Sequence, residues 1–142
     1  MLQDTQMLQR IYENAGTGLY SIQTILPKST DSHVTAELMS YNSRLKNISD
    51  RAQQMLQGRG VECQEQEIMS KMGIWTGIQM NTLLDQSASH IAEIVIQGNT
   101  MGITQMTTEL NSSSVISPEV RQLADEFVNI QRSNIELMKS YL

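Results

Sequence analysis

The chain has 142 residues, the size of one ordinary domain, with 39% hydrophobic, 18% charged and only 4% aromatic residues. Its formal net charge of -5 argues against nucleic-acid binding, which needs a clustered basic surface. The single cysteine, Cys63, excludes an internal disulfide. No stretch approaches the roughly 20 apolar residues of a membrane-spanning helix, and the N-terminus lacks the basic start and apolar run of a secretion signal. We therefore expect one cytoplasmic domain, residues 1–142, that contacts no membrane.

The first predicted helix runs from about residue 4 to residue 26. Apolar or small residues recur there in alternating steps of three and four, a spacing typical of a helix inside a bundle: Leu8, Ile11, Ala15, Gly18, Ile22 and Ile25. Pro27 predicts the end of this helix. The four residues 29–32 then offer several possible N-caps for the next one.

The second predicted helix has the most regular pattern in the chain. Its apolar face repeats 4-3-4-3-4-3 without a break: Val34, Leu38, Tyr41, Leu45, Ile48, Ala52 and Met55. Gly58 and Gly60 predict where it ends, because glycine commonly follows the last turn of a helix.

Residues 65–80 predict a shorter helix that crosses from one end of the bundle to the other, although Gly73 and Gly77 lower its helix propensity. A third long helix then starts at a cap, Asp85 or Ser87, and fades in the loop at residues 111–114. Its expected face comprises Leu84 or Ala88, then Ile91, Val95, Gly98, Gly102 and Met106. One continuous kinked helix over residues 65–110 is the alternative.

The last predicted helix begins at Ser117-Pro118-Glu119, which combines a capping hydroxyl, a proline in the first turn and an acid at the positive end of the helix dipole. Its expected face contains Val120, Leu123, Ala124, Phe127, Ile130, Asn134 and Met138. No segment alternates as a strand would. The sequence therefore predicts an all-α fold, a four-helix bundle with a short crossover helix between helices two and three.

A bundle of this size raises the question of a di-iron centre, whose helices carry glutamate followed three residues later by histidine. None of the ten glutamates is followed in this way. His90 with Glu93 is the only candidate metal pair, and a surface hydrogen bond explains it better, since two ligands bind a metal weakly. We expect no metal and no cofactor. An atypical site in which Glu13 or Glu37 joins this pair is the alternative.

No catalytic constellation is found in the sequence. Acidic residues surround Cys63, which should raise the pKa of its thiol and suppress the thiolate. No serine lies in a Gly-x-Ser-x-Gly turn, and no glycine-rich phosphate loop is present. The sequence therefore indicates a protein that is not an enzyme.

Two pairs of glycines interrupt predicted helices: Gly16 with Gly18, and Gly98 with Gly102. Each costs roughly 0.5–1 kcal/mol relative to alanine. Close approach of neighbouring helices is the expected reason. A cavity for a small ligand is the alternative, and the polar Gln131 and Asn134 of the last helix would then give it specificity, because buried amides must find partners.

Three stretches resemble the C-terminal helix pair of small bacterial His/Met-rich proteins of the ferritin-like superfamily. They are residues 89–98 (SHIAEIVIQG), 118–124 (PEVRQLA) and 134–142 (NIELMKSYL). The resemblance implies a ferritin-like bundle. It does not imply the metal chemistry of that family, because Gly98 and Asn99 stand where a His-His pair is typical.

The sequence thus favours a non-enzymatic, ferritin-like bundle protein that acts through self-association or protein–protein contacts. Its expected interface is a cluster too apolar for one face of a short helix: Met69, Met72, Trp75 and Ile78. A homo-oligomer is expected, with a dimer favoured. Atypical metal binding at His90 and Glu93 is the first alternative, and small-molecule binding in the interior of the bundle is the second.

Overall fold

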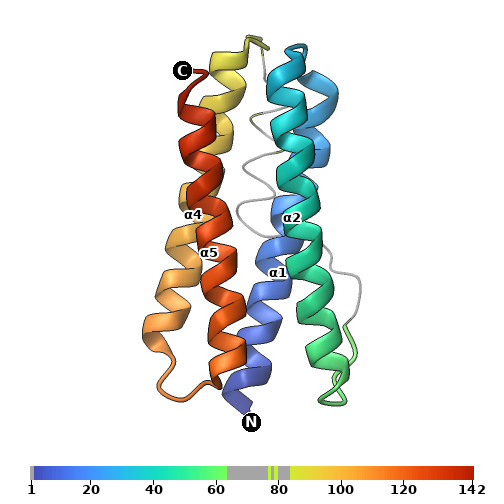
Figure 1. Ribbon diagram of the computed structural model, residues 1–142, viewed down its shortest axis with the longest axis vertical. Coiled ribbons are helices and arrows are strands. Elements are labelled where there is room, and N and C mark those ends of the chain that lie inside the picture. Colours follow the sequence, from blue (N-terminus) through green and yellow to red (C-terminus); the bar gives the residue numbers. More distant parts are fainter. Residues whose placement is uncertain (1, 64–76, 78, 80–83) are drawn as a thin grey trace.

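The computed structural model describes residues 2–63, 77, 79 and 84–142, which form a bundle of four long helices (Figure 1). The helices are α1 (Leu2–Ile25), α2 (Ser32–Gln57), α4 (Ala88–Ser112) and α5 (Pro118–Lys139), and a single 3₁₀ turn, Leu26–Lys28, follows α1. No strand occurs in these residues. The predicted all-α bundle is confirmed.

The helices pack as two sequential pairs, α1 with α2 and α4 with α5, and the pairs meet through α2 against α5 and α1 against α4. In Figure 1 the chain starts at one end of the bundle and finishes at the other. Helix α2 ends at the same end as the N-terminus, whereas α4 begins at the opposite end. The helices in each of these four contacting pairs are therefore antiparallel, whereas α2 and α4 run in the same direction.

Helix α2 starts at one of the predicted caps. The Asp31 carboxylate accepts hydrogen bonds from the backbone N–H groups of His33, at 2.8 Å, and Val34, at 3.0 Å. These groups have no partner inside the helix, so the aspartate satisfies two of the four exposed donors. The proline after α1 ends that helix as predicted and forms part of the 3₁₀ turn.

Helix α4 starts at Ala88, with Ser87 as its N-cap. The Ser87 hydroxyl accepts from the N–H of His90 at 3.2 Å, and the backbone of Ser87 is extended (φ -62°, ψ 154°). Residues 84–87 are not helical, so the alternative of one continuous helix over residues 65–110 is wrong. Leu84 is fully exposed and does not belong to the buried face.

Helix α5 begins at Pro118 as predicted, but Ser117 makes no side-chain capping hydrogen bond, so that detail of the prediction is wrong. The carboxylate of Asp4 on α1 accepts from the N–H of Ser117 at 2.7 Å instead. A carboxylate from α1 thus provides the acceptor for the backbone N–H group of the residue that precedes α5.

The core follows the predicted apolar faces in most positions. The largest fully buried side chains come from all four helices: Phe127, Leu8, Ile11, Leu38, Leu45, Ile48, Leu56, Ile91, Met106, Leu123, Met138 and Gln131. None of the helices in the described part of the chain has the length and apolarity needed to cross a bilayer.

At three positions the buried residue lies one place beyond the predicted one. Leu56 is buried where Met55 was expected, Gln131 where Ile130 was expected, and Asn99 is buried whereas Gly98 is only half-buried. A straight helix has 3.6 residues per turn, so a strict three-and-four rhythm drifts away from the buried face over several turns. Apart from residues 77 and 79, the predicted crossover helix falls outside the described residues. So does the predicted interface: Met69, Met72, Trp75 and Ile78.

Candidate functional site

The predicted metal pair lies on the surface at the start of α4. His90 Nδ1 is 3.7 Å from Glu93 Oε2, and the two side chains are 35% and 57% exposed. Glu13 instead pairs with Arg10 on α1, at 3.2 Å. In the described residues no three His, Cys, Asp or Glu side chains come together as metal ligands. The atypical metal site therefore stays a prediction.

Cys63 follows the end of α2 and is half-buried. Burial raises the pKa of its thiol, which is the expected direction; of the acidic neighbours on which the prediction rested, Glu65 and Glu67 lie outside the described residues. A raised thiol pKa lowers the thiolate fraction and with it the reactivity of the sulfur.

The glycines of α1 and α4 differ in what surrounds them. A Cβ atom at Gly18 would lie 2.8 Å from the Leu45 side chain, and one at Gly102 would lie 2.8 Å from Gln131 Nε2. Both contacts are too short for a real Cβ, so these two glycines permit close packing, as expected. A Cβ at Gly98 would meet no described atom within 4 Å. Close helix approach therefore does not explain Gly98. Gly16 is half-buried in α1.

Polar side chains of three helices meet inside the bundle, and we call Tyr41, Asn99, Gln131 and Asn134 the amide network. The Tyr41 hydroxyl donates to Gln131 Oε1 at 2.9 Å. Asn134 Nδ2 donates to Asn99 Oδ1 at 3.3 Å, and Asn99 Nδ2 donates to the Val95 carbonyl at 3.0 Å. Burial raises the pKa of Tyr41 far above its ordinary value, so its hydroxyl stays protonated and remains a donor.

All four members of the amide network are at most 4% exposed. Asn134 Oδ1 is buried and has no hydrogen-bond partner in the described part of the chain. The sequence pointed to Gln131 and Asn134 because amides interrupt the last apolar face. Asn99 was named only because it stands, with Gly98, where the resembling proteins carry a His-His pair, and nothing in the apolar pattern marks it as buried.

A recess lies between α1 and α4, beside the amide network. Its volume is about 30 Å³, and it is partly open to solvent. Ile22, Ile25, Ile94 and Val95 provide its apolar walls. Its polar lining consists of Ser21, Tyr41, Asn99 and Gln131, together with the backbone at Gly18 and Gly98. The recess thus brings together three residues singled out from the sequence: Gly18, Gly98 and Gln131. A fourth, Asn134, lies next to it, because it donates a hydrogen bond to Asn99 of the lining.

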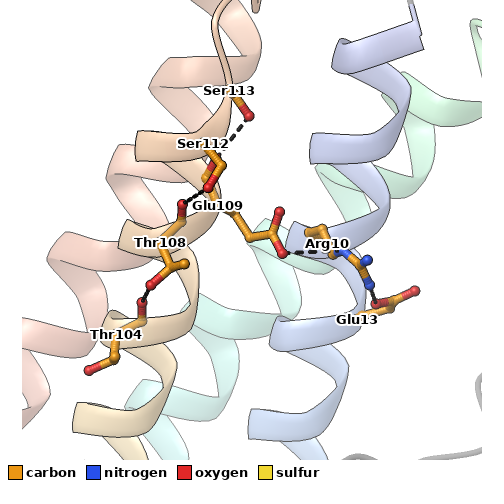
Figure 2. Close-up of polar contacts among 7 residues, drawn as sticks. All are labelled: Arg10, Glu13, Thr104, Thr108, Glu109, Ser112 and Ser113. Carbon is orange, nitrogen blue, oxygen red and sulfur yellow. Dashed lines mark hydrogen bonds and ion pairs between the residues drawn. The ribbon is translucent and has the colours of Figure 1, made fainter.

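The side of α4 that faces away from the bundle carries a row of exposed polar side chains, which we call the outer face of α4. It comprises Gln97, Thr100, Thr104, Gln105 and Thr108. Residues 94–108 contain no ionisable side chain. The hydroxyls of Thr100, Thr104 and Thr108 each donate to the carbonyl four residues earlier, at 2.8–2.9 Å, and Ser112 continues the row (Figure 2).

Because these hydroxyl hydrogens are already used, the threonines present methyl groups and acceptor oxygens to solvent. Charges flank the row at both ends. The pair His90 and Glu93 precedes it, and Glu109 follows it, 3.5 Å from Arg10 of α1 (Figure 2).

A charged group, which we call the Asp4 cluster, joins three chain segments at the end of the bundle where the N-terminus lies (Figure 1). Arg59 Nη2 is 3.6 Å from Asp4 Oδ2 and 3.2 Å from Glu119 Oε1. Asp4 is only 3% exposed, and the hydrogen bond from the Ser117 N–H is the main reason that its pKa lies below the ordinary value. Asp4 was not predicted as a functional or core residue, since the helix dipole favours an acid in the first turn of any helix.

The fold and these sites define a four-helix bundle with a neutral interior recess and an uncharged outer helix face. Comparisons with protein-family models, with curated proteins and with solved structures give no significant match.

Proposed function

We propose that the protein is a non-enzymatic, ferritin-like helical bundle that acts through protein–protein contacts, and that the contact is self-association through the outer face of α4. The direction of the helices supports the ferritin-like part of this proposal. Helices α2 and α4 run in the same direction (Figure 1), as the second and third long helices do in that superfamily.

The observation that carries the proposal is the absence of charge over residues 94–108. The exposed faces of α2 and α5 bear Lys46, Arg121 and Asp125 among other charges, whereas the outer face of α4 bears only amides and hydroxyls. Depletion of charged residues, Lys and Glu in particular, distinguishes the centre of a protein interface from the rest of the surface.

A second copy of the chain is the partner that suits this face. With a net charge of -5, two copies repel each other over most of their surfaces, and an uncharged row is where this repulsion is weakest. In an antiparallel pair of α4 helices related by a two-fold axis near Met101, Gln97 of one copy would oppose Gln105 of the other. Amide side chains both donate and accept, so such a contact is self-complementary, as a two-fold interface requires.

Sedimentation velocity over a range of protein concentrations tests the proposal. We expect the wild-type chain to form dimers, and Thr104→Glu to weaken dimerisation by at least about tenfold, because the carboxylate of each copy would lose water in the contact without meeting an opposite charge. Ser43→Glu is the matched control. Ser43 is also exposed and also donates to the carbonyl four residues earlier, on α2, so this variant should dimerise like the wild type.

A wild-type chain that stays monomeric at high concentration would contradict the proposal, as would equal dimerisation of the two glutamate variants. Elemental analysis of the purified protein tests the metal-binding alternative in the same sample. Stoichiometric metal that is lost in His90→Ala would support that alternative.

A further inference from the structure

Close packing of the helices does not explain why a glycine stands at position 98. A side chain at this position would meet no described atom within 4 Å of its Cβ, and glycine weakens the interior of a helix compared with alanine. Gly102, one turn later, does have a packing reason, because Gln131 lies against it. Among the described residues, Gly98 therefore leaves its side of the recess unfilled.

The recess has a polar end that is fixed in position. Gln131 is 1% exposed, and the Tyr41 hydroxyl holds its oxygen at 2.9 Å. The hydrogen bonds between described residues use the oxygen of this amide and not its nitrogen. Nε2 carries two hydrogens, and it is not one of the described side-chain atoms that are fully buried without a partner. A ligand group that accepts a hydrogen bond from Nε2 would complete this end of the site.

The lining also limits the charge of a ligand. Among the described residues that line the recess, tyrosine is the only ionisable type, and its hydroxyl is neutral. A carboxylate or an ammonium group entering the recess would lose water and gain no opposite charge, which is strongly unfavourable. A neutral molecule does not meet this penalty.

We propose that the recess between α1 and α4 binds a small neutral molecule with a carbonyl or carboxamide oxygen, which accepts a hydrogen bond from Gln131 Nε2. The short aliphatic part of the molecule packs between Ile22 and Ile94. A cavity needs roughly 10–15 Å³ to hold one water-sized group, so a volume of about 30 Å³ encloses two such groups. The remainder of the ligand lies toward the open side. This site is separate from the outer face of α4.

Three probes of nearly equal size test the proposal: propionamide, propionate and propylammonium. Each is titrated into the full-length protein labelled with ¹⁵N, and the signals of the Gln131 side-chain amide and the Gly98 backbone amide are followed. We expect a saturable shift with propionamide and at least about tenfold weaker binding of both ions, because only the ions lose water without compensation. Equal binding of all three, or no saturable shift with propionamide, would overturn the proposal.

Gly98→Leu fills the recess and should abolish the propionamide shift. Ser43→Leu is its control, since it introduces the same side chain at an exposed position of α2 that belongs neither to the recess nor to the outer face of α4; binding should be retained. If Gly98→Leu binds propionamide like the wild type, the site is elsewhere and the proposal fails.

Gln131→Met provides a second test that does not depend on folding of the leucine variant. Methionine keeps the length of the side chain but removes the amide. Propionamide should then lose its advantage over the ions, whereas an unchanged preference would contradict the role of Nε2. Thr104→Glu should bind propionamide normally, so failure of self-association and failure of ligand binding can be told apart.

Discussion

The Asp4 cluster and the amide network each contain buried polar side chains, yet they are built differently. The Asp4 cluster is charged, lies at the end of the bundle, and ties the starts of α1 and α5 to the residue after α2 through hydrogen bonds and ion pairs of 2.7–3.6 Å. The amide network is neutral, lies within the bundle, and leaves Asn134 Oδ1 without a partner in the described residues. It also borders the recess.

This difference separates a stabilising cluster from a candidate binding site. The backbone amide and the guanidinium that Asp4 contacts compensate the burial of its charge, which is the condition for a buried ion to be tolerated. Incompletely paired amides beside an open space destabilise the fold, and native proteins usually have a reason for such groups. We therefore expect the Asp4 cluster to stabilise the bundle, whereas the proposed ligand would bind beside the amide network.

Asp4→Ala should have the largest effect on stability. It leaves the N–H of Ser117 and the half-exposed Arg59 without their carboxylate, and loss of a charged partner of this kind costs about 2–3 kcal/mol. Urea unfolding followed by circular dichroism measures the change. A loss below about 0.5 kcal/mol, the usual size for a surface substitution, would show that the Asp4 cluster does not stabilise the bundle.

Lowering the pH should destabilise the folded protein through the same residue, Asp4. The pKa of Asp4 is lowered in the folded chain, mainly by the Ser117 N–H, so the native state binds its proton less readily than the unfolded state does. The stabilisation is complete above the unfolded value of about 3.9 and is lost as pH falls through the folded value. Unfolding midpoints measured from neutral pH down to pH 3 and below should fall less steeply in Asp4→Asn than in the wild type. Parallel curves would contradict this.

Gly102→Ala should destabilise the protein by about 1–2 kcal/mol. The new Cβ would lie 2.8 Å from Gln131 Nε2, and the Tyr41 hydroxyl restrains that amide. Overpacking typically costs 1–3 kcal/mol, which exceeds the gain of about 0.5–1 kcal/mol from replacing glycine in a helix. Urea unfolding provides the measurement, and a stabilised variant would show that Gln131 moves freely.

Tyr41→Phe should cost about 1 kcal/mol. It removes the donor to Gln131 Oε1 and leaves a buried acceptor without its partner. The same substitution should broaden or shift the Gln131 side-chain signal in NMR spectra, because the amide loses the bond that orients it. No change in either quantity would mean that the amide network is not held by Tyr41.

The apolar pattern of the sequence predicted the four helices, most of their caps and most of the buried positions. Single positions of the buried face were less accurate, as Leu56 and Gln131 show, because a rhythm of three and four departs from the true helical repeat. The buried polar residues were the hardest to predict. Nothing in the apolar pattern marks Asp4 or Asn99, since their burial depends on partners from other helices.

The candidate site was predicted only in part. Two of the glycines and the amides of α5 were singled out, but the sequence favoured close packing for all the glycines, whereas the structure separates Gly18 and Gly102, which pack closely, from Gly98, which does not. That distinction depends on the distance between helices, which a single sequence does not contain.

The central claim is that Gly98 keeps the recess open and has no packing role, and the urea unfolding midpoint of Gly98→Ala tests it most directly. The added methyl meets no described atom, so the account predicts a more stable protein, by about 0.5–1 kcal/mol, from the higher helix propensity of alanine. A lower midpoint than that of the wild type would show that the position is tightly packed, and would contradict the account.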